Sequence, residues 1–376
     1  MRIIINIGIF IFNIIYKIFK LFPTHKKVTF ISRQSNKPSN DIVMINKKIS
    51  DLYPEYKNVL LCKTLEKNFH SIFSYFFHLF CQMYHIATSE IVILDSYCIL
   101  ISVLKHKKNL LIIQMWHSIG TMKKFGYSIL DKPEGSSSKL AKSLKMHKNY
   151  DYILSSGNGY RSHLAEGFGY PVEKIITLPL PRIELLKNNE YADTIKKKIL
   201  EIYPQLNKKK NILYVPTFRK ANDEDFTKAL SDLCNSINYN QYNLIIKPHP
   251  LTYTKDFCEN NAIIDHYFSS FDMLFISDIV ISDYSCIVYE AAVLKKPIYF
   301  YTYDYEMYMS SRETYMDYKK EIPGPMCSSA GDLIKTISNT SYDYNKLNNF
   351  LNKYVDINNE HETENIVNFI FENRKI

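Results

Sequence analysis

Short runs of β-branched and aliphatic residues, separated by helix-length stretches, constrain the fold of this 376-residue chain more than any other feature. In the first half they occupy residues 28–32, 59–61, 90–94, 110–115 and 152–154. In the second half they recur at residues 212–215, 243–246, 278–281 and 297–301. Strands that alternate with helices form parallel sheets covered on both faces. The sequence therefore predicts an α/β fold with two Rossmann-like, doubly wound domains.

The clearest boundary between the two series lies at Pro179 and Pro181, where the alternation stops before it starts again. We expect an N-terminal domain over residues 23–182 and a C-terminal domain over residues 183–376, including the closing helices. Two such domains joined by a hinge create a cleft. Ligands of open α/β sheets bind beyond the carboxyl ends of the strands, so the residues that follow each strand are the candidates for a functional site.

An apolar segment with lysines at one end opens the chain. Its uncharged part, residues 3–16, is short for a bilayer span, and Lys17 and Lys20 follow it. No small-residue cleavage site comes after it, which argues against a cleaved signal peptide. We expect residues 1–22 to form a helix in the membrane interface, with the lysines reaching the head groups. A spanning helix and a packing helix buried in the protein are the alternatives.

Charge and cysteine content narrow the classes of partner. The net charge of +9 suits an anionic partner such as a nucleotide-activated donor, a polyphosphate chain or a lipid surface. No zinc-finger spacing or aromatic-basic RNA motif is present, so we do not expect nucleic acid. The seven cysteines include no C-x-x-C pair, which argues against a disulfide scaffold and a zinc site.

Two of the expected strands run directly into polar side chains. His117 follows the strand at 110–115, where a histidine is either a general base or a hydrogen-bonded structural residue. Thr217 and Arg219 follow the strand at 212–215. A hydroxyl and a guanidinium at a strand end form a phosphate contact or belong to a plain surface turn.

Two further strands repeat this setting in the second half. Lys247 and His249 come directly after one strand, with prolines that fix the backbone around the imidazole. A second histidine in the same topological position favours function over structure for both. After the next strand, Asp283 or Ser285 can cap the helix that follows, and the start of a helix suits an anion. Glu290 lies farther along that helix, within reach of ribose hydroxyls.

Taken together, these residues resemble the CDP-glycerol glycerophosphotransferase family of teichoic-acid and capsule synthesis. Order and spacing agree from about residue 110 to residue 333. The matching motifs are Trp116-His117, Lys123-Lys124-Phe125-Gly126, Pro216-Thr217-Phe218-Arg219, Lys247-Pro248-His249-Pro250, Ser282-Asp283-Tyr284-Ser285, Lys296-Pro297-Ile298-Tyr299-Phe300-Tyr301, Tyr303-Asp304, Arg312, Tyr315 and Pro323-Gly324-Pro325. The chain departs from the family pattern in a one-residue-longer segment after His117 and at Cys286, Glu290 and Glu313.

The resemblance implies a two-domain glycosyltransferase-B fold and a donor that is CDP-glycerol or a related CDP-polyol, with no cofactor. An acceptor hydroxyl of an anionic glycopolymer or lipid-linked acceptor would attack the β-phosphorus and release CMP, at the cytoplasmic face of the bacterial membrane. His117 would act as general base and His249 would stabilise the donor phosphate. Donor binding is expected from Thr217, Arg219, Lys247, Ser282, Asp283, Ser285, Glu290 and Arg312.

Two charged segments complete the expectations. We expect no essential metal, because the single D-x-D at Asp223 to Asp225 lies early in an expected exposed helix, where acidic residues favour the helix dipole. Lysines recur every third residue in the expected helix over residues 136–150. That basic face is either a solvated surface or a contact for acceptor and membrane. The residues in question are Lys139, Lys142 and Lys145, together with Lys123 and Lys124.

Two rival functions use the same fold. One is a nucleotide-sugar glycosyltransferase of envelope polysaccharide synthesis, because fold alone does not determine the reaction. The other is a non-catalytic, membrane-docked scaffold, which would have no need of polar groups at several strand ends.

Overall fold

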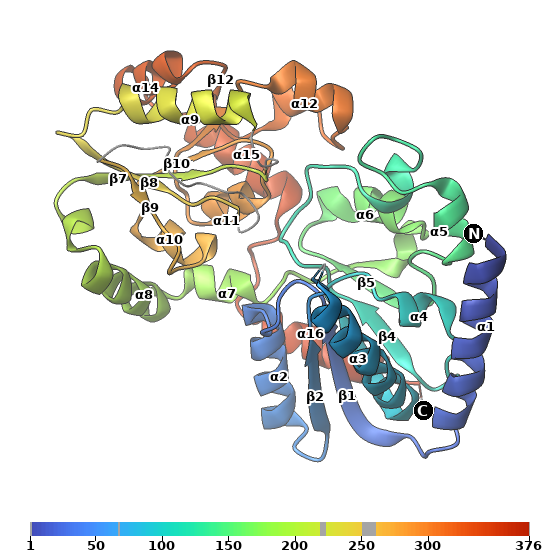
Figure 1. The fold of residues 1–376 in the computed structure, drawn as a ribbon. Helices are drawn as coiled ribbons and strands as arrows, with labels where there is room; N and C mark the ends of the chain where they lie inside the picture. Colours follow the sequence, from blue (N-terminus) through green and yellow to red (C-terminus); the bar gives the residue numbers. More distant parts are fainter. Residues whose placement is uncertain (1, 67, 219–222, 250–260, 376) are drawn as a thin grey trace. The chain divides into compact units, whose positions relative to one another are not determined.

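The computed structural model describes residues 2–66, 68–218, 223–249 and 261–375 (Figure 1). The chain divides into two compact units. Unit 1 comprises residues 1–118, 125–184 and 358–376, and unit 2 comprises residues 119–124 and 185–357. Both are α/β units with a parallel sheet, as the alternation of runs predicts.

Unit 1 is built on a six-stranded sheet in the order β2-β1-β3-β4-β5-β6, with every pair parallel. The order reverses between β1 and β3, which makes the ends of these strands the place where such sheets bind ligands. The strands are β1 (His25–Ser32), β2 (Lys57–Cys62), β3 (Ser89–Leu94), β4 (Leu111–Gln114), β5 (Tyr152–Ser155) and β6 (Ile175–Thr177).

Helices cover this sheet. They are α1 (Arg2–Phe19), α2 (Asn40–Leu52), α3 (Phe69–Thr88), α4 (Ile99–Val103), α5 (Ser138–Ser143), α6 (Arg161–Phe168) and α16 (Glu362–Glu372), with 3₁₀ turns η1 (Gly126–Ile129), η2 (Asn158–Tyr160) and η3 (Val172–Lys174). Helix α7 (Arg182–Lys187) contains the boundary between the units. The domain border predicted at residue 182 lies at the first residue of this helix, two residues before the observed boundary after Glu184.

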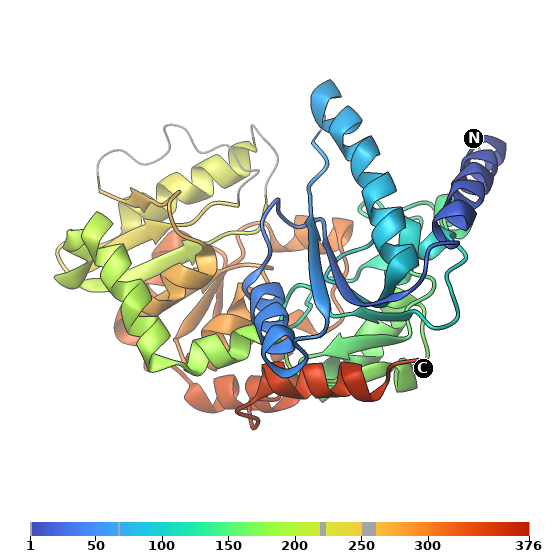
Figure 2. The same cartoon turned by 90° about the horizontal axis from the view of Figure 1, so that it is seen from below.

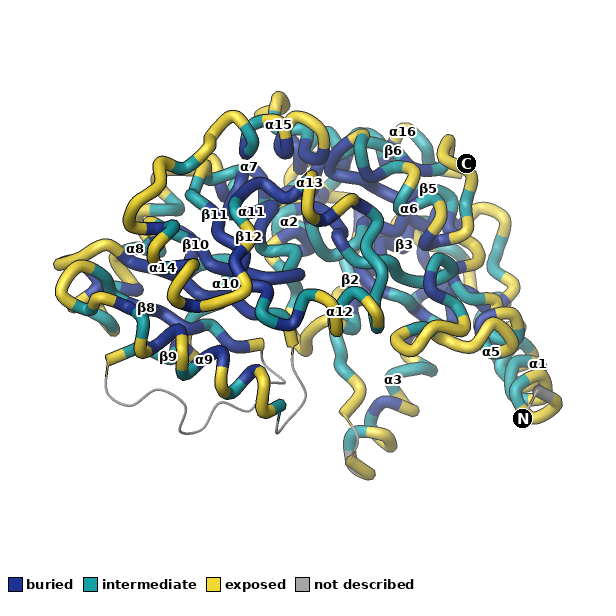
Figure 3. The backbone as a smooth tube through the Cα atoms, turned by 90° about the horizontal axis from the view of Figure 1, so that it is seen from above, coloured by how far each residue is buried: buried dark blue, intermediate teal, exposed yellow. Residues whose placement is uncertain are grey.

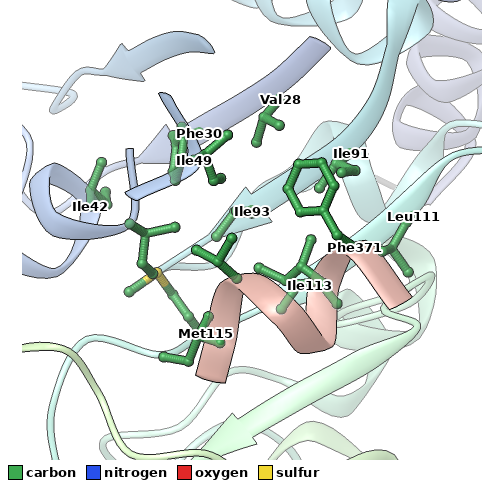
Figure 4. Close-up of a cluster of buried hydrophobic side chains, with 14 of the residues drawn as sticks. Val28, Phe30, Ile42, Ile49, Ile91, Ile93, Leu111, Ile113, Met115 and Phe371 are labelled. Atoms are coloured by element: carbon green, nitrogen blue, oxygen red, sulfur yellow. The ribbon is translucent and has the colours of Figure 1, made fainter. Parts of the chain in front are cut away.

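The C-terminal helix α16 belongs to unit 1, whereas the sequence placed all of residues 183–376 in the second domain. Its buried residues Ile366 and Ile370 pack with Ile91 and Ile113 of the first sheet. Phe371 of the same helix belongs to this cluster (Figure 4), and its ring stacks on Tyr53 at 3.6 Å between centroids. The apolar face of α16 fills a gap in the core of unit 1, so the chain returns to its first unit at its end.

Unit 2 has its own six-stranded parallel sheet, in the order β12-β11-β10-β7-β8-β9. The order reverses between β7 and β10. The strands are β7 (Lys210–Val215), β8 (Tyr242–Ile246), β9 (Ile263–Ile264), β10 (Ile279–Ser282), β11 (Ile298–Tyr301) and β12 (Met326–Cys327). The helices are α8 (Asn189–Ile202), η4 (Pro204–Asn207), α9 (Glu224–Ser236), α10 (Ser270–Ile276), α11 (Ile287–Val293), α12 (Tyr305–Ser311), α13 (Tyr318–Glu321), α14 (Ala330–Asn339) and α15 (Tyr344–Tyr354). The central strands of both sheets are buried (Figure 3).

The N-terminal segment forms helix α1, which packs on unit 1 through one side only. Tyr16 is buried, with its hydroxyl 3.0 Å from His106 Nδ1, and Asn13 donates to the carbonyl of Val103. The other side of α1 exposes Ile3, Ile4, Ile7, Phe10, Ile11, Ile14 and Ile18. Within the described part of the chain, every helix falls short of the length and apolarity that a bilayer span requires.

Candidate active site

His117 lies just beyond the end of β4, beside the end of β3. Its Nδ1 atom is 3.0 Å from the backbone oxygen of Asp95. A carbonyl oxygen only accepts, so Nδ1 carries the proton and Nε2 keeps its lone pair. Burial lowers the pKa of His117 to about 4, against a weaker opposing effect of the Asp95 carbonyl. The imidazole is therefore neutral near pH 7 and can accept a proton through Nε2.

Trp116 sets the direction of this histidine through a strained backbone. Its φ of 64° lies in the left-handed region, which a bulky residue adopts only where its surroundings enforce it. The side-chain oxygen of Gln114 accepts from the Trp116 amide at 2.9 Å, and the indole packs against His117 and Phe125 at 4.2 and 4.5 Å. The turn thus rests on several contacts, as strain at a functional site requires.

Asp95 is a site residue that the sequence analysis missed. It follows β3 at the point where the strand order reverses, and its side chain is only 1% exposed. Burial raises its carboxyl pKa to about 6, although the hydroxyls of Ser32 and Ser96 oppose the shift. Asp95 directly follows the expected strand at 90–94, so the strand-end rule that selected His117 also identifies it.

In unit 2, Thr217 and Asp283 meet where the strand order reverses between β7 and β10. The amide of Thr217 donates to both Asp283 carboxylate oxygens, at 2.8 and 3.0 Å, and its hydroxyl donates to Oδ1 at 2.6 Å. Asp283 is fully buried. Its carboxylate therefore positions Thr217. The sequence analysis had predicted that both residues contact the CDP-linked donor substrate. Ser282 is buried too, and its hydroxyl donates to the Val215 carbonyl.

Residues 119–124 belong to unit 2, although only Ser118 separates them from His117. The amide of Lys124 donates to the Glu313 carbonyl at 3.0 Å, and the two side chains form an ion pair at 2.7 Å. Lys123 Nζ lies 3.5 Å from the Thr217 hydroxyl and 5.4 Å from the centre of the Tyr308 ring. The structure thus places Lys123 at the site of unit 2, whereas the sequence assigned it to acceptor or membrane.

His249 shares this part of unit 2. Its exposed ring packs against Phe218 with 5.4 Å between centroids. Desolvation and then the charge of Lys123 lower its pKa, so the imidazole is predominantly neutral near pH 7. Thr217, Lys123 and His249 therefore gather a hydroxyl, a cation and an imidazole in one region. Arg219, the expected fourth member, lies outside the described residues.

Lys247 has a different partner from the one expected. Its ammonium group pairs with Asp265 at 2.9 Å and also donates to the carbonyl of that residue. Asp265 is fully buried and accepts from the Tyr203 hydroxyl at 2.9 Å. Lys247 thus neutralises a buried carboxylate behind β8, a long-range pairing that no local pattern signals.

The other expected donor residues lie around α11 and α12. The amide of Ile287 donates to the Ser285 hydroxyl at 3.4 Å. The sequence suggested Asp283 or Ser285 as the residue that caps α11. The N-cap is instead Cys286, which makes no side-chain cap hydrogen bond. Glu290 is buried on α11, and Arg312 is half-buried at the end of α12.

An aromatic stack beside Thr217 is a further feature that the sequence analysis did not find. The rings of Tyr284 and Tyr308 lie parallel with 3.6 Å between centroids, and the Tyr284 hydroxyl donates to Asp304 at 3.1 Å. The Tyr318 hydroxyl donates to the Asp283 carbonyl at 2.8 Å. These contacts hold the loop after β10 in place.

Of the two charged segments, the lysine-rich one is a shorter helix than expected, and the D-x-D lies at the start of a helix as expected. The expected helix over residues 136–150 ends at Ser143, because Lys145, His147 and Asn149 adopt positive φ and break it. Lys139 and Lys142 lie exposed on α5, and Lys145 lies exposed in the turn beyond it. Asp223 is the N-cap of α9 and accepts from the Phe226 amide at 2.9 Å. In the described residues no group of His, Cys, Asp and Glu is arranged to hold a metal ion.

Two doubly wound units, each with polar side chains at its strand ends, are typical of an enzyme of the α/β type. The chain belongs to the CDP-glycerol:poly(glycerophosphate) glycerophosphotransferase family, whose model matches residues 14–372. This result confirms the family resemblance seen in the motifs.

Curated relatives and solved structures agree with this assignment. The teichoic acid ribitol-phosphate primase of Bacillus spizizenii is 31% identical over 371 residues, covering 96% of this chain and 95% of that protein. The teichoic acid glycerol-phosphate primase of Bacillus subtilis is 30% identical, covering 78% of this chain and 76% of that protein. The solved wall teichoic acid polymerase TagF superposes with a TM-score of 0.74 at 20% identity, covering 100% of this chain and 97% of that one, which shows a common fold.

Proposed function

We propose that this enzyme transfers a polyol phosphate, glycerol phosphate in the first instance, from a CDP-linked donor to a hydroxyl of a cell-wall or capsule glycopolymer and releases CMP. The observation that carries the proposal is the fixed tautomer of His117, in which the Asp95 carbonyl holds the Nδ1 proton and Nε2 is left as a base. Family membership supplies the donor class.

In the proposed reaction, Nε2 of His117 takes the proton from the acceptor hydroxyl as its oxygen attacks the β-phosphorus of the donor. The bond from that phosphorus to the oxygen bridging the two phosphates breaks, and CMP leaves. Such phosphoryl transfer depends on positioning and charge stabilisation more than on covalent help. The glycosyltransferase-B arrangement of the two units, with both histidines serving one donor and one acceptor, stays a prediction.

The groups of unit 2 suit the donor phosphates. Lys123 and Thr217 supply a cation and a hydroxyl within 3.5 Å of each other, and His249 supplies a ring N–H. Asp283 holds Thr217 in position. The expected contacts from Ser285 and Arg219 to the phosphates, from Glu290 to the ribose and from Arg312 to the donor stay predictions.

The first experiment determines which polyol the enzyme transfers. Relatives of similar identity are a ribitol-phosphate primase and a glycerol-phosphate primase. Purified enzyme is offered CDP-glycerol, CDP-ribitol and a UDP-sugar with a teichoic-acid primer, and the product is analysed by mass spectrometry. We expect a mass increase of one or more glycerol phosphates. Addition of ribitol phosphate alone would overturn the choice of glycerol, and addition of a sugar would overturn the reaction class.

We also propose that the enzyme works at the cytoplasmic face of the membrane. Helix α1 exposes one apolar side, and α3 exposes Phe69, Ile72, Phe73, Phe76 and Phe77. The N-terminal half of α3 projects beyond the sheet of unit 1 (Figures 2 and 3). Large exposed apolar patches of this kind mark binding surfaces. Co-sedimentation with phosphatidylglycerol vesicles tests the proposal: we expect binding that the double variant Ile7→Asp, Phe10→Asp abolishes, and equal binding by both proteins would contradict it.

A further inference from the structure

An apolar pocket of about 240 Å³ lies in unit 1, between α1, α3, α4 and the residue that ends α5. Figures 1 and 2 show α1 running beside this part of the unit. Every lining residue is apolar or glycine: Ile5, Gly8, Ile9, Phe12, Leu79, Ile99, Leu100, Val103 and Leu144. An apolar cavity of about 150 Å³ accommodates one benzene ring, so this pocket has room for roughly ten carbon atoms.

Gly8 keeps the pocket open. It lies in the interior of α1, where glycine is among the least favourable residues. Its φ is not in the left-handed region, and a Cβ atom added to it would meet no atom within 4 Å. Neither the backbone conformation nor the packing of the described residues therefore requires a glycine at this position. Its effect is to leave space in the pocket for another molecule.

Two exposed lysines, Lys142 and Lys145, lie within two residues of a residue that lines the pocket. Helix α5 contacts α1, and its C-cap Leu144 is part of the pocket lining. The neighbouring Lys142 and Lys145 are exposed, and the first turn of α5 contains no acidic residue. The surfaces of α1 and α3 that flank the pocket expose large apolar side chains. An apolar chain attached to an anionic head group matches both parts of this region.

We propose that this pocket binds one acyl chain of an anionic membrane lipid, with the lipid phosphate at Lys142 and Lys145. The proposal rests on the membrane location proposed above, and it adds a defined lipid site to a general apolar surface. A bound chain would fix the depth and rotation of unit 1 in the membrane, which an apolar patch alone does not do.

The pocket is tested with n-decyl phosphate, kept below its micellar concentration, by isothermal titration calorimetry on the full chain. Each buried methylene contributes about fourfold in affinity, so decyl phosphate should bind about 15-fold more tightly than octyl phosphate. Gly8→Phe fills the pocket and should weaken decyl phosphate at least tenfold. Gly8→Ala leaves most of the volume free and should stay within about threefold of the natural protein. Equal affinity of the two chain lengths, or undiminished binding by Gly8→Phe, would overturn the pocket.

Further arms separate the alternatives. Ile5→Trp, which fills the pocket from another position, should weaken decyl phosphate as well, and circular dichroism verifies that both filled variants fold. Lys142→Glu should weaken decyl phosphate in a salt-dependent way and leave decyl maltoside unchanged. Tighter binding of geranyl phosphate than of decyl phosphate would overturn the acyl-chain assignment in favour of an isoprenoid lipid. A different result would contradict the membrane location proposed above. In that case the unmodified protein would bind decyl phosphate but would not co-sediment with phosphatidylglycerol vesicles.

Discussion

The proton on Nδ1 of His117 decides what this residue can do. Because the Asp95 carbonyl holds that proton and burial keeps the ring neutral, Nε2 is a base throughout the neutral pH range. His117→Ala should lower the rate of CMP formation by about 10²–10⁴, the usual contribution of general base catalysis. The assay is turnover at saturating donor, with exposed His361→Ala as the matched control. A folded His117→Ala protein with near-natural turnover would contradict the assignment.

The buried carboxyl of Asp95 makes stability depend on pH. Its pKa is about 6 in the folded protein against 3.8 as its ordinary value, so the folded state binds more protons between these pH values. Stability attributable to this group is therefore present below about pH 4 and is lost as the pH rises through 6. Asp95→Asn should raise the free energy of unfolding at pH 7.5 on the order of 2 kcal/mol and change little at pH 4. Urea unfolding at both pH values measures it, and a gain of equal size at both would refute the cause.

Residues at strand ends were predictable because parallel strands deliver their carboxyl ends to one edge of a sheet. This rule selected His117, Thr217 and His249 from the sequence alone. It did not reveal that Lys247 pairs with Asp265, or that Lys123 lies beside Thr217. Those pairings join residues distant along the chain, and only the folded backbone brings them together.

At the scale of elements, hydrophobic periodicity located most strands and helices but not their partners. Helix α16 is amphipathic in the sequence, yet which sheet it covers depends on where a gap remains in a core. Helix α5 is shorter than its lysine pattern suggested, because three residues with positive φ follow it. The first of them is Lys145, and lysine is a residue type that gives no signal of this conformation.

The placement of α16 in the core of unit 1 makes a testable element-scale prediction. Ile370 is fully buried against that core, so Ile370→Ala should lower the stability of unit 1 by about 2–5 kcal/mol. The control Asn368→Ala, on the same helix and partly exposed, should change it little. Hydrogen exchange locates the effect. Faster exchange is expected in β3 and β4, and a change confined to β7 and β10 would show that α16 stabilises the other unit.

At the scale of the whole molecule, we expect the two units to divide the chemistry. The proposed base, His117, lies in unit 1, and the cation, hydroxyl and second imidazole proposed for the donor lie in unit 2. Two parallel sheets were predictable from nine apolar runs. The exchange of segments between the units was not, because residues 119–124 and 358–376 cross a boundary that sequence places at a single point.

We predict that the reaction requires no metal ion. We assign the stabilisation of charge at the donor phosphates to protein side chains, and Asp223 of the D-x-D caps a helix. Turnover should therefore stay within about twofold after exhaustive chelation followed by gel filtration, a change in barrier of only ~0.4 kcal/mol. Loss of activity that magnesium or manganese restores would contradict this prediction.

The site of bond cleavage tests the central claim most directly. Attack on the β-phosphorus releases CMP and adds a polyol phosphate to the acceptor, whereas attack on the polyol carbon releases CDP and adds the polyol alone. Chromatography of the nucleotide products, with mass spectrometry of the acceptor from the same reaction, distinguishes the two. We predict one CMP for each polyol phosphate added. Release of CDP, with an acceptor mass that lacks phosphate, would contradict the account.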